Sequence, residues 1–221
     1  MTSGRPDDVG AVRAATLLLP AVLALGGCTT SVDGLPTPAP VTATPDAVGD
    51  LEGLVVGGVP SGLPRLPDDD LNPPAGAKSV EDVATYADDP ARERDVLADY
   101  GYRHGWERFW GHEDGPVTGV FVDQFEQRWG ASAYAADLAR NDAEHYGAML
   151  RENPADLPGN CRSMTISEPD AGRDLWGPAA FAWCGHGVFS VGVTAIADSV
   201  DAAEEEMRAV VAAQIERLPP G

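Results

Sequence analysis

The feature that most limits the fold of this chain is an order of expected strands and helices that occurs twice after residue 101. In each copy, alternating segments joined by a tight turn are followed by a segment with helical periodicity. The expected segments are 102–110, 116–125 and 130–150 in the first copy, and 161–167, 179–184, 188–197 and 201–218 in the second. Alternation predicts strands, and apolar residues three and four apart predict helices. Because tight turns pair strands antiparallel, we expect an α+β domain with an antiparallel sheet of about five strands. It would consist of two β-hairpin-plus-helix halves, with the helices packed largely on one face.

Two short helices are expected before the first copy. Ser79 can cap one of them, and Asp89-Pro90 begins the other, because Asp accepts hydrogen bonds at a helix start and Pro suits the first helical position. Gly101 ends that second helix. Further upstream, the apolar segment 51–59 is expected to dock as an extended edge.

The N-terminal residues have the form of a secretory signal. The apolar run Ala14–Leu25 is shorter than the roughly 20 residues of a spanning helix, and it leads into Leu25-Gly26-Gly27-Cys28. These four residues match the lipobox of bacterial lipoproteins. The match implies removal of residues 1–27, lipid on the Cys28 thiol and anchoring to the outer face of the cytoplasmic membrane, in the cell envelope. An ordinary signal peptide and an uncleaved helix are the alternatives.

Residues 28–50 are rich in proline and threonine and are expected to form a tether. Such a segment cannot bury enough apolar surface to fold, and its prolines keep it extended. The folded domain is then expected over 51–221.

The charge of the chain excludes some partners. The formal net charge is −20, so nucleic acid and anionic lipid headgroups would meet a surface of like charge. We therefore expect contact with the membrane through the N-terminal lipid and no nucleic-acid partner. Hydrophobic residues make up 43% of the chain, which is enough to build a core.

Two cysteines remain once Cys28 is assigned to the lipid. In an oxidising location Cys161 and Cys184 are expected to form a disulfide. The alternative is a metal-binding or catalytic thiol pair, with His186 close to Cys184 in the sequence.

Signatures of catalysis and of metal binding are weak in this sequence. The stretch from Gly187 to Gly192 places Ser190 in an expected strand, not at the strand-to-helix turn of a nucleophile elbow. Residues 68–72 resemble the start of a calcium loop, but Pro73 and Ser79 stand where that loop needs Gly and Glu. We expect no metal and no cofactor, and we rank a hydrolase that uses Ser190 or His186 third among the candidate functions.

The strand 102–110 holds the most distinctive group of side chains. By alternation, five of them share one side: Tyr102, His104, Trp106, Arg108 and Trp110. Two tryptophans that flank an arginine can stack on a flat or anionic ligand and hydrogen-bond to it. The alternative is that this face packs in the core with Arg108 at the rim.

Several stretches resemble a known group of proteins. Residues 28–36, 99–106 and 120–125, with Gly130-Ala131, resemble uncharacterised lipoproteins of mycobacteria and related actinobacteria. The plan over 51–219 is similar to the extracellular sensor domain of PknH-type receptor kinases. That resemblance implies an antiparallel sheet with helices around a cleft. It implies no catalytic residues in this chain, because these families have no agreed catalytic residues to transfer.

These observations lead to three hypotheses for the function. The first is a cell-surface lipoprotein with a non-catalytic, ligand-binding or sensor-like domain that takes a small molecule. The second is a structural or protein-interaction lipoprotein whose partner is another envelope protein. The third is the hydrolase.

Overall fold

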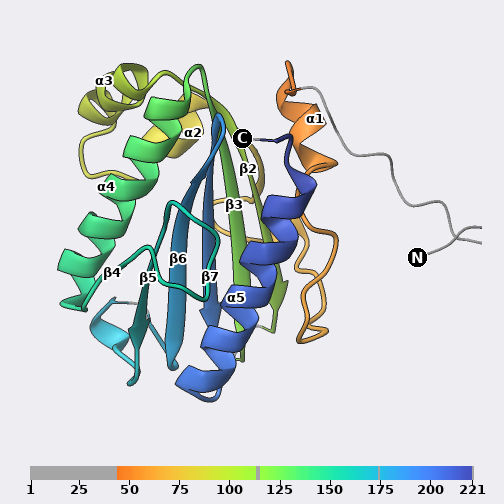
Figure 1. Ribbon diagram of the computed structural model, residues 1–221, viewed down its shortest axis with the longest axis vertical. Coiled ribbons are helices and arrows are strands. Elements are labelled where there is room, and N and C mark those ends of the chain that lie inside the picture. Colours follow the sequence, from red (N-terminus) through yellow and green to blue (C-terminus); the bar gives the residue numbers. More distant parts are fainter. Residues whose placement is uncertain (1–43, 113–114, 174, 221) are drawn as a thin grey trace, which may run out of the picture. The chain divides into compact units, whose positions relative to one another are not determined.

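A computed structural model describes residues 44–112, 115–173 and 175–220. In this part of the chain, seven strands form one antiparallel sheet with helices packed on it, an α+β fold (Figure 1). The strands are β1 (Gly76–Lys78), β2 (Tyr102–Gly111), β3 (Val117–Phe125), β4 (Arg151–Glu152), β5 (Cys161–Ile166), β6 (Ala179–His186) and β7 (Phe189–Ile196). Their order across the sheet is β1-β2-β3-β7-β6-β5-β4, so the hairpins β2–β3 and β6–β7 meet at the centre.

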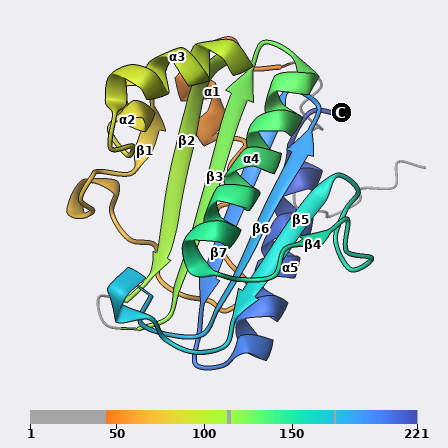
Figure 2. The ribbon, with the colours of Figure 1, turned by 90° about the vertical axis from the view of Figure 1, so that its left-hand side faces the viewer.

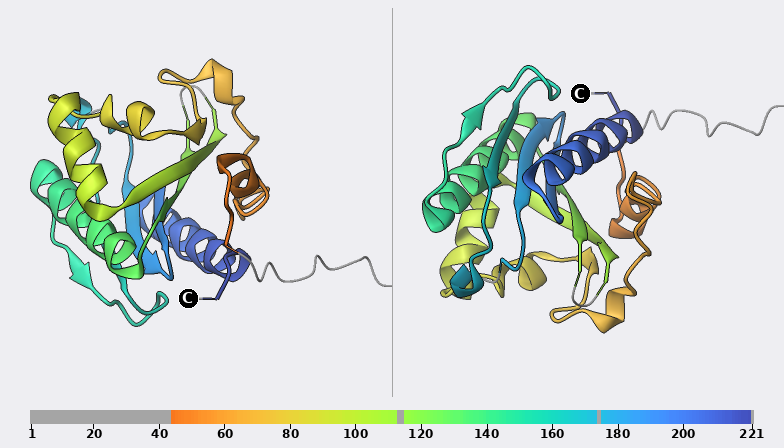
Figure 3. Two further views of the ribbon diagram at one scale, coloured as in Figure 1. Left: turned by 90° about the horizontal axis from the view of Figure 1, so that it is seen from above. Right: turned by 90° about the horizontal axis from the view of Figure 1, so that it is seen from below.

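The described helices cover both faces of this sheet. They are α1 (Val48–Glu52), α2 (Val80–Ala84), α3 (Pro90–Tyr100), α4 (Arg128–Tyr146) and α5 (Val200–Arg217), with short 3-10 turns η1 (Asp68–Asp70) and η2 (Ala171–Arg173). α4, α2 and α3 lie on one face, which we call the α4 face, and α5 and α1 lie on the other, the α5 face (Figures 1, 2 and 3).

The expectations of about five strands and of helices largely on one face are therefore wrong in detail. The two additional strands, β1 and β4, have three and two residues, too few to show alternation. β6 is buried along Ala179–Cys184, on both of its sides, and a strand of that kind needs cover on both faces. The two hairpin-plus-helix halves are present, as β2–β3–α4 and β6–β7–α5.

Short-range signals located the small helices correctly. Ser79 Oγ accepts a hydrogen bond from the Asp82 amide at 3.2 Å, and Asp89 accepts one from the Arg92 amide at 3.1 Å. Gly101 ends α3 with a left-handed backbone, φ 71°. The expected turn at 113–114 lies outside the described residues.

The N-terminal segment of the domain is not the expected extended edge. Its apolar residues pack as the short helix α1 and a loop, with Leu51 and Val55 buried on the α5 face. The packing begins before residue 51, because Gln124 Nε2 donates a hydrogen bond to the Pro45 carbonyl at 2.8 Å. Residues from about 45 onward therefore belong to the domain and not to the expected tether.

The two faces differ in the continuity of their cores. On the α5 face, one apolar cluster extends from Leu51 and Trp110 across the sheet to α5. The Cys161–Cys184 disulfide lies in this cluster and joins directly paired residues of β5 and β6, which confirms the expected pairing. On the α4 face the apolar residues form two separate clusters, one around Phe125 and Tyr134 and one around Met164 and Phe181.

Candidate ligand-binding site

The expected ligand-binding strand is β2, but its five side chains do not share one face. The pairing of β2 with β3 shifts between Tyr102 and His104, and this irregularity places Tyr102 in the cluster of the α4 face. Trp106 and Trp110 lie in the core of the α5 face, where Trp110 is 1% exposed. His104 Nε2 is 3.0 Å from Gln124 Oε1.

Arg108 binds the protein's own main chain. The residue is buried, and its guanidinium donates hydrogen bonds to the carbonyls of Val56 at 2.9 Å and Val55 at 3.3 Å. The position of this arginine and of the two tryptophans favours packing as their role. The structure therefore points to the opposite face of the sheet for a ligand site.

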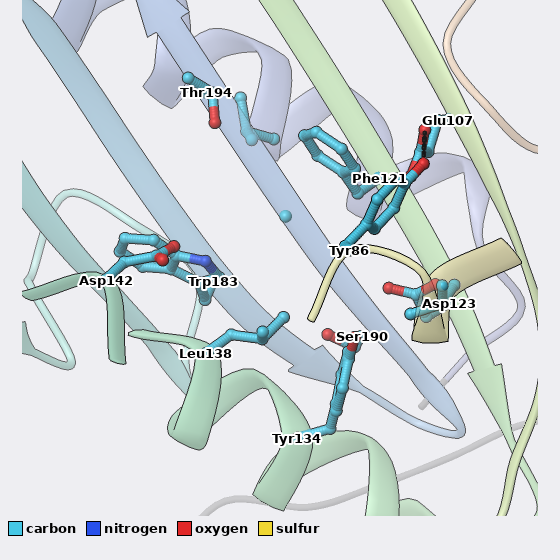
Figure 4. Close-up of a pocket in the computed structure, with 13 residues that line it drawn as sticks. Tyr86, Glu107, Phe121, Asp123, Tyr134, Leu138, Asp142, Trp183, Ser190 and Thr194 are labelled. Carbon is cyan, nitrogen blue, oxygen red and sulfur yellow. Dashed lines mark hydrogen bonds between the residues drawn. The ribbon is translucent and has the colours of Figure 1, made fainter. Parts of the chain in front are cut away.

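A cavity of about 220 Å³ lies on that opposite face, between the sheet and the helices α2 and α4 (Figure 4). Its apolar walls are Val83, Phe121, Leu138 and Trp183, and its polar lining is Tyr86, Glu107, Asp123, Tyr134, Asp142, Ser190 and Thr194. A second hollow of about 320 Å³, bordered by residues 71–73 and Phe109, shares Tyr86, Glu107 and Phe121 with the first.

The cavity exists because β7 carries small side chains on this face. Ser190, Gly192 and Thr194 line the cavity, whereas Val191 and Ala195 on the other face belong to the continuous core. At one end, Gly185 allows α4 to approach the sheet closely, since an added Cβ would lie 3.0 Å from Ser132 Cα. Beyond this contact the short side chains leave the space unfilled.

The register of the central strands aligns the lining in two rows. In one row Asp123 pairs with Ser190, and glycines stand on both sides of them, Gly105 and Gly185. The room beside Asp123 depends on Gly105, because a Cβ there would lie 2.3 Å from Asp123 Oδ1. Paired residues on one face of antiparallel strands have Cβ atoms about 5 Å apart, so Asp123 and Ser190 are neighbouring residues on the cavity floor.

In the second row a glycine separates two aromatic rings. Phe121 pairs with Gly192, and Gly192 pairs with Trp183 on the other side. Both rings line the cavity, and no side chain of Gly192 stands between them.

Asp123 is the carboxylate at the centre of the site. It accepts a hydrogen bond from the Tyr102 hydroxyl at 3.1 Å and forms no ion pair within the described part of the chain. Burial raises the pKa of Asp123 to about 7, the negative charge of Glu107 acts in the same direction, and the Tyr102 hydrogen bond opposes them.

Glu107 differs from Asp123 because its charge is balanced. Lys78 Nζ lies 3.1 Å from Glu107 Oε2, and both residues are buried. The Tyr86 hydroxyl donates to the same carboxylate at 3.0 Å, and Lys78 Nζ also lies 5.3 Å above the Tyr86 ring. Burial raises the pKa of Glu107, while Lys78 and Tyr86 act against that rise.

Three further polar groups complete the lining. Ser190 is 1% exposed and Tyr134 is 7% exposed, and neither hydroxyl has a hydrogen-bond partner among the described residues. Asp142, on α4, is half-buried, and burial raises its pKa against the opposing charge of His145. Two hydroxyls without a partner in the described part of the chain therefore line one cavity, where they are available to bond with a molecule that enters it.

Sequence reasoning missed this site, although one signal was present. Phe121, Asp123 and Phe125 alternate on one face of β3, and a carboxylate between two aromatic residues on a partly buried strand face is unusual. The partners of Asp123 come from distant segments, so the signal by itself does not define a cavity.

The residues suggested for hydrolysis are not brought together. Ser190 faces α4, whereas His186 Nε2 is 3.0 Å from the carbonyl of Pro219, which follows α5 on the other face. The predicted lipidation site, Cys28, lies outside the described residues.

Comparisons with protein families, with curated proteins and with solved structures found no match for this chain. The resemblance to actinobacterial lipoproteins and to kinase sensor domains therefore stays a prediction. Among the helices that the structure describes, none is long and apolar enough to cross a membrane.

Proposed function

We propose that this protein is a lipid-anchored envelope protein whose domain binds a small ligand, without catalysis, in the cavity between the sheet, α2 and α4. The observation that carries the proposal is the unpartnered polar lining. Ser190 and Tyr134 are buried residues that line the cavity, and their hydroxyls have no partner among the described residues, beside the unpaired carboxylate of Asp123. A ligand can bond directly to these groups, and each such hydrogen bond contributes about 0.5–1.5 kcal/mol.

The anchored location has separate support. The lipobox-like residues Leu25-Gly26-Gly27-Cys28 predict lipidation, and the Cys161–Cys184 disulfide is typical of a domain outside the cytoplasm. The Pro/Thr-rich residues after Cys28 would hold the cavity away from the membrane surface. Globomycin tests the anchor: we expect an unprocessed precursor to accumulate in treated cells, and normal processing would contradict lipidation.

Native mass spectrometry of the purified protein tests the binding function. We expect a retained small compound in the wild type and its loss in Ser190→Val, which removes a cavity hydroxyl and adds a methyl group. Ser163→Val is the matched control, because Ser163 is also a buried serine without a partner among the described residues, but it lies outside the cavity lining. Equal retention by both variants would count against this cavity.

The second candidate is a protein-interaction lipoprotein, and two exposed tryptophans favour it. Trp129 is 60% exposed and Trp176 is 53% exposed, and tryptophan is enriched in protein interfaces. Cross-linking in cells distinguishes the candidates. A stoichiometric protein partner, together with a purified protein that retains no compound, would favour the second.

A further inference from the structure

We propose that the ligand is a small organic ammonium compound whose charged group lies beside Asp123 and Ser190 and whose hydrocarbon part lies between Phe121 and Trp183. This inference rests on the proposed function and adds the chemical class of the ligand. Its basis is the arrangement of charge, hydroxyl groups and aromatic rings in the cavity.

The charges of the lining favour a cation. Asp123, Asp142 and Glu107 all border the cavity, and of these only Glu107 has a cationic partner within the described residues, Lys78. An anion would meet three carboxylates in a partly enclosed space, where water screens charges weakly. A cation would instead supply the missing counter-charge of Asp123.

The hydroxyls identify the kind of cation. An ammonium group has three N–H donors and needs acceptors in several directions. Asp123 and Ser190 are neighbours on paired strands, and Tyr134 approaches from α4. The unpartnered hydroxyl oxygens of Ser190 and Tyr134, which line the cavity, can accept two of these hydrogen bonds while Asp123 accepts the third.

Metal coordination is less suited to this lining. No group of three His, Cys, Asp or Glu side chains in the described ranges is placed to hold a metal ion. Most of the remaining wall is aromatic or aliphatic, and aromatic faces attract organic cations.

The second row provides space for hydrocarbon. Because Gly192 lies between Phe121 and Trp183, a chain of methylene groups can lie against both rings, directly next to the row that holds Asp123. The volume of about 220 Å³ is below the roughly 300–1,000 Å³ of sites for drug-sized ligands, so the ligand is small. A longer apolar tail would extend past Tyr86 into the adjoining hollow.

Calorimetric titration of the full chain at pH 8 tests the inference with four probes: n-butylammonium, n-butanol, butyrate and glucose. We expect n-butylammonium to bind, and n-butanol and glucose to bind at least about tenfold more weakly, which is the effect of losing one charged hydrogen bond. Butyrate should not bind. Asp123→Asn should weaken n-butylammonium binding by at least about tenfold, because the Asn side chain keeps the shape but not the charge.

Glu144→Gln is the control for net charge. Glu144 is an exposed carboxylate on α4 outside the cavity lining, and its replacement should leave the affinity unchanged. Any compound that the purified protein retains should contain a basic nitrogen.

Four outcomes would overturn the inference. If n-butanol or glucose binds as tightly as n-butylammonium, or if Asp123→Asn has no effect while Ser190→Val abolishes binding, the cationic class is wrong and the binding function stands. If the retained compound lacks a basic nitrogen, the same conclusion follows. If no probe binds and the purified protein retains nothing, the inference and the proposed function fail together.

Discussion

The two faces of the sheet differ in what some of their polar side chains contact. On the α5 face, buried polar side chains bind the main chain of the N-terminal segment: Arg108 donates to the Val56 carbonyl at 2.9 Å, and Gln214 accepts from the Val56 amide at 3.0 Å and donates to the Leu54 carbonyl at 3.0 Å. On the α4 face, Ser190 and Tyr134 have no such partners among the described residues.

This difference separates a structural role from a binding role. Residues 51–56 form no sheet pairing, so their buried backbone groups need partners, and Arg108 and Gln214 supply them. The polar groups of the cavity satisfy no nearby backbone. Neither burial nor the absence of an internal partner marks a binding site alone, because Trp106 Nε1 and Ser163 Oγ are buried without partners among the described residues and do not line the cavity. The distinguishing feature of Ser190 and Tyr134 is an unpartnered hydroxyl on a residue that lines a cavity.

The largest effect is expected from breaking the one balanced ion pair beside the cavity. Lys78→Met leaves Glu107 buried without its counter-charge, which should lower the free energy of unfolding by about 3–5 kcal/mol in urea denaturation. Adding Glu107→Gln should restore most of that loss. A double variant as unstable as Lys78→Met would show that packing, and not the unpaired charge, causes the effect.

The next largest effect is expected on the α5 face, at the disulfide. Replacing both Cys161 and Cys184 with Ala should lower the free energy of unfolding by about 3 kcal/mol, because the bond closes a loop between positions 23 residues apart. Denaturation of the oxidised wild type and of the variant measures this difference. Reduction of the wild type should bring its denaturation midpoint to that of the variant. If the midpoints still differ after reduction, loss of the disulfide does not explain the effect.

Arg108 and Ser190 give the most direct comparison of the faces. Arg108→Met leaves the buried carbonyls of Val55 and Val56 without their donor and should lower the free energy of unfolding by about 2–3 kcal/mol. Ser190→Ala removes a hydroxyl without an internal partner and should change it by less than about 0.5 kcal/mol. Similar losses for the two variants in urea denaturation would remove the distinction between the faces.

The last comparison depends on pH and concerns Asp123. Its pKa is about 7 in the folded protein against a reference value of 3.8, so between these pH values the folded state binds more protons than the unfolded state. The contribution of this group to stability therefore falls as pH rises through that window, by up to about 1.4 kcal/mol per pH unit. Asp123→Asn removes the ionisation and should stabilise the protein more at pH 8 than at pH 5.

The groups that face Asp123 are Tyr102 and Glu107 from β2, Tyr86 after α2, Tyr134 from α4, and Ser190 from β7. These groups are present in the wild type and in Asp123→Asn, so the difference in stability between the two proteins isolates the ionisation of Asp123. Thermal denaturation at pH 5 and at pH 8 measures this difference. An equal difference at pH 5 and pH 8 would contradict the raised pKa.

Part of the fold could be read from short stretches of sequence. The caps at Ser79, Asp89 and Gly101 and the two hairpin-plus-helix halves depend on residues close together in the chain, and the structure has them. The position of Tyr102 could not be read in this way. Strict alternation places it with Trp106, but the shift in the β2–β3 pairing turns it to the other face.

The sequence by itself determined the antiparallel α+β plan and the cysteine pairing, because these depend on local periodicity and on the cysteines available. The anchor at Cys28 rests on a short motif and stays a prediction. Only the tertiary structure decided which face holds a site. The cavity depends on the register that aligns Asp123 with Ser190 and Phe121 with Gly192, and on α4 lying over short side chains of β7. Such contacts join residues far apart in the chain, and a shift of one residue in register would turn each side chain to the opposite face.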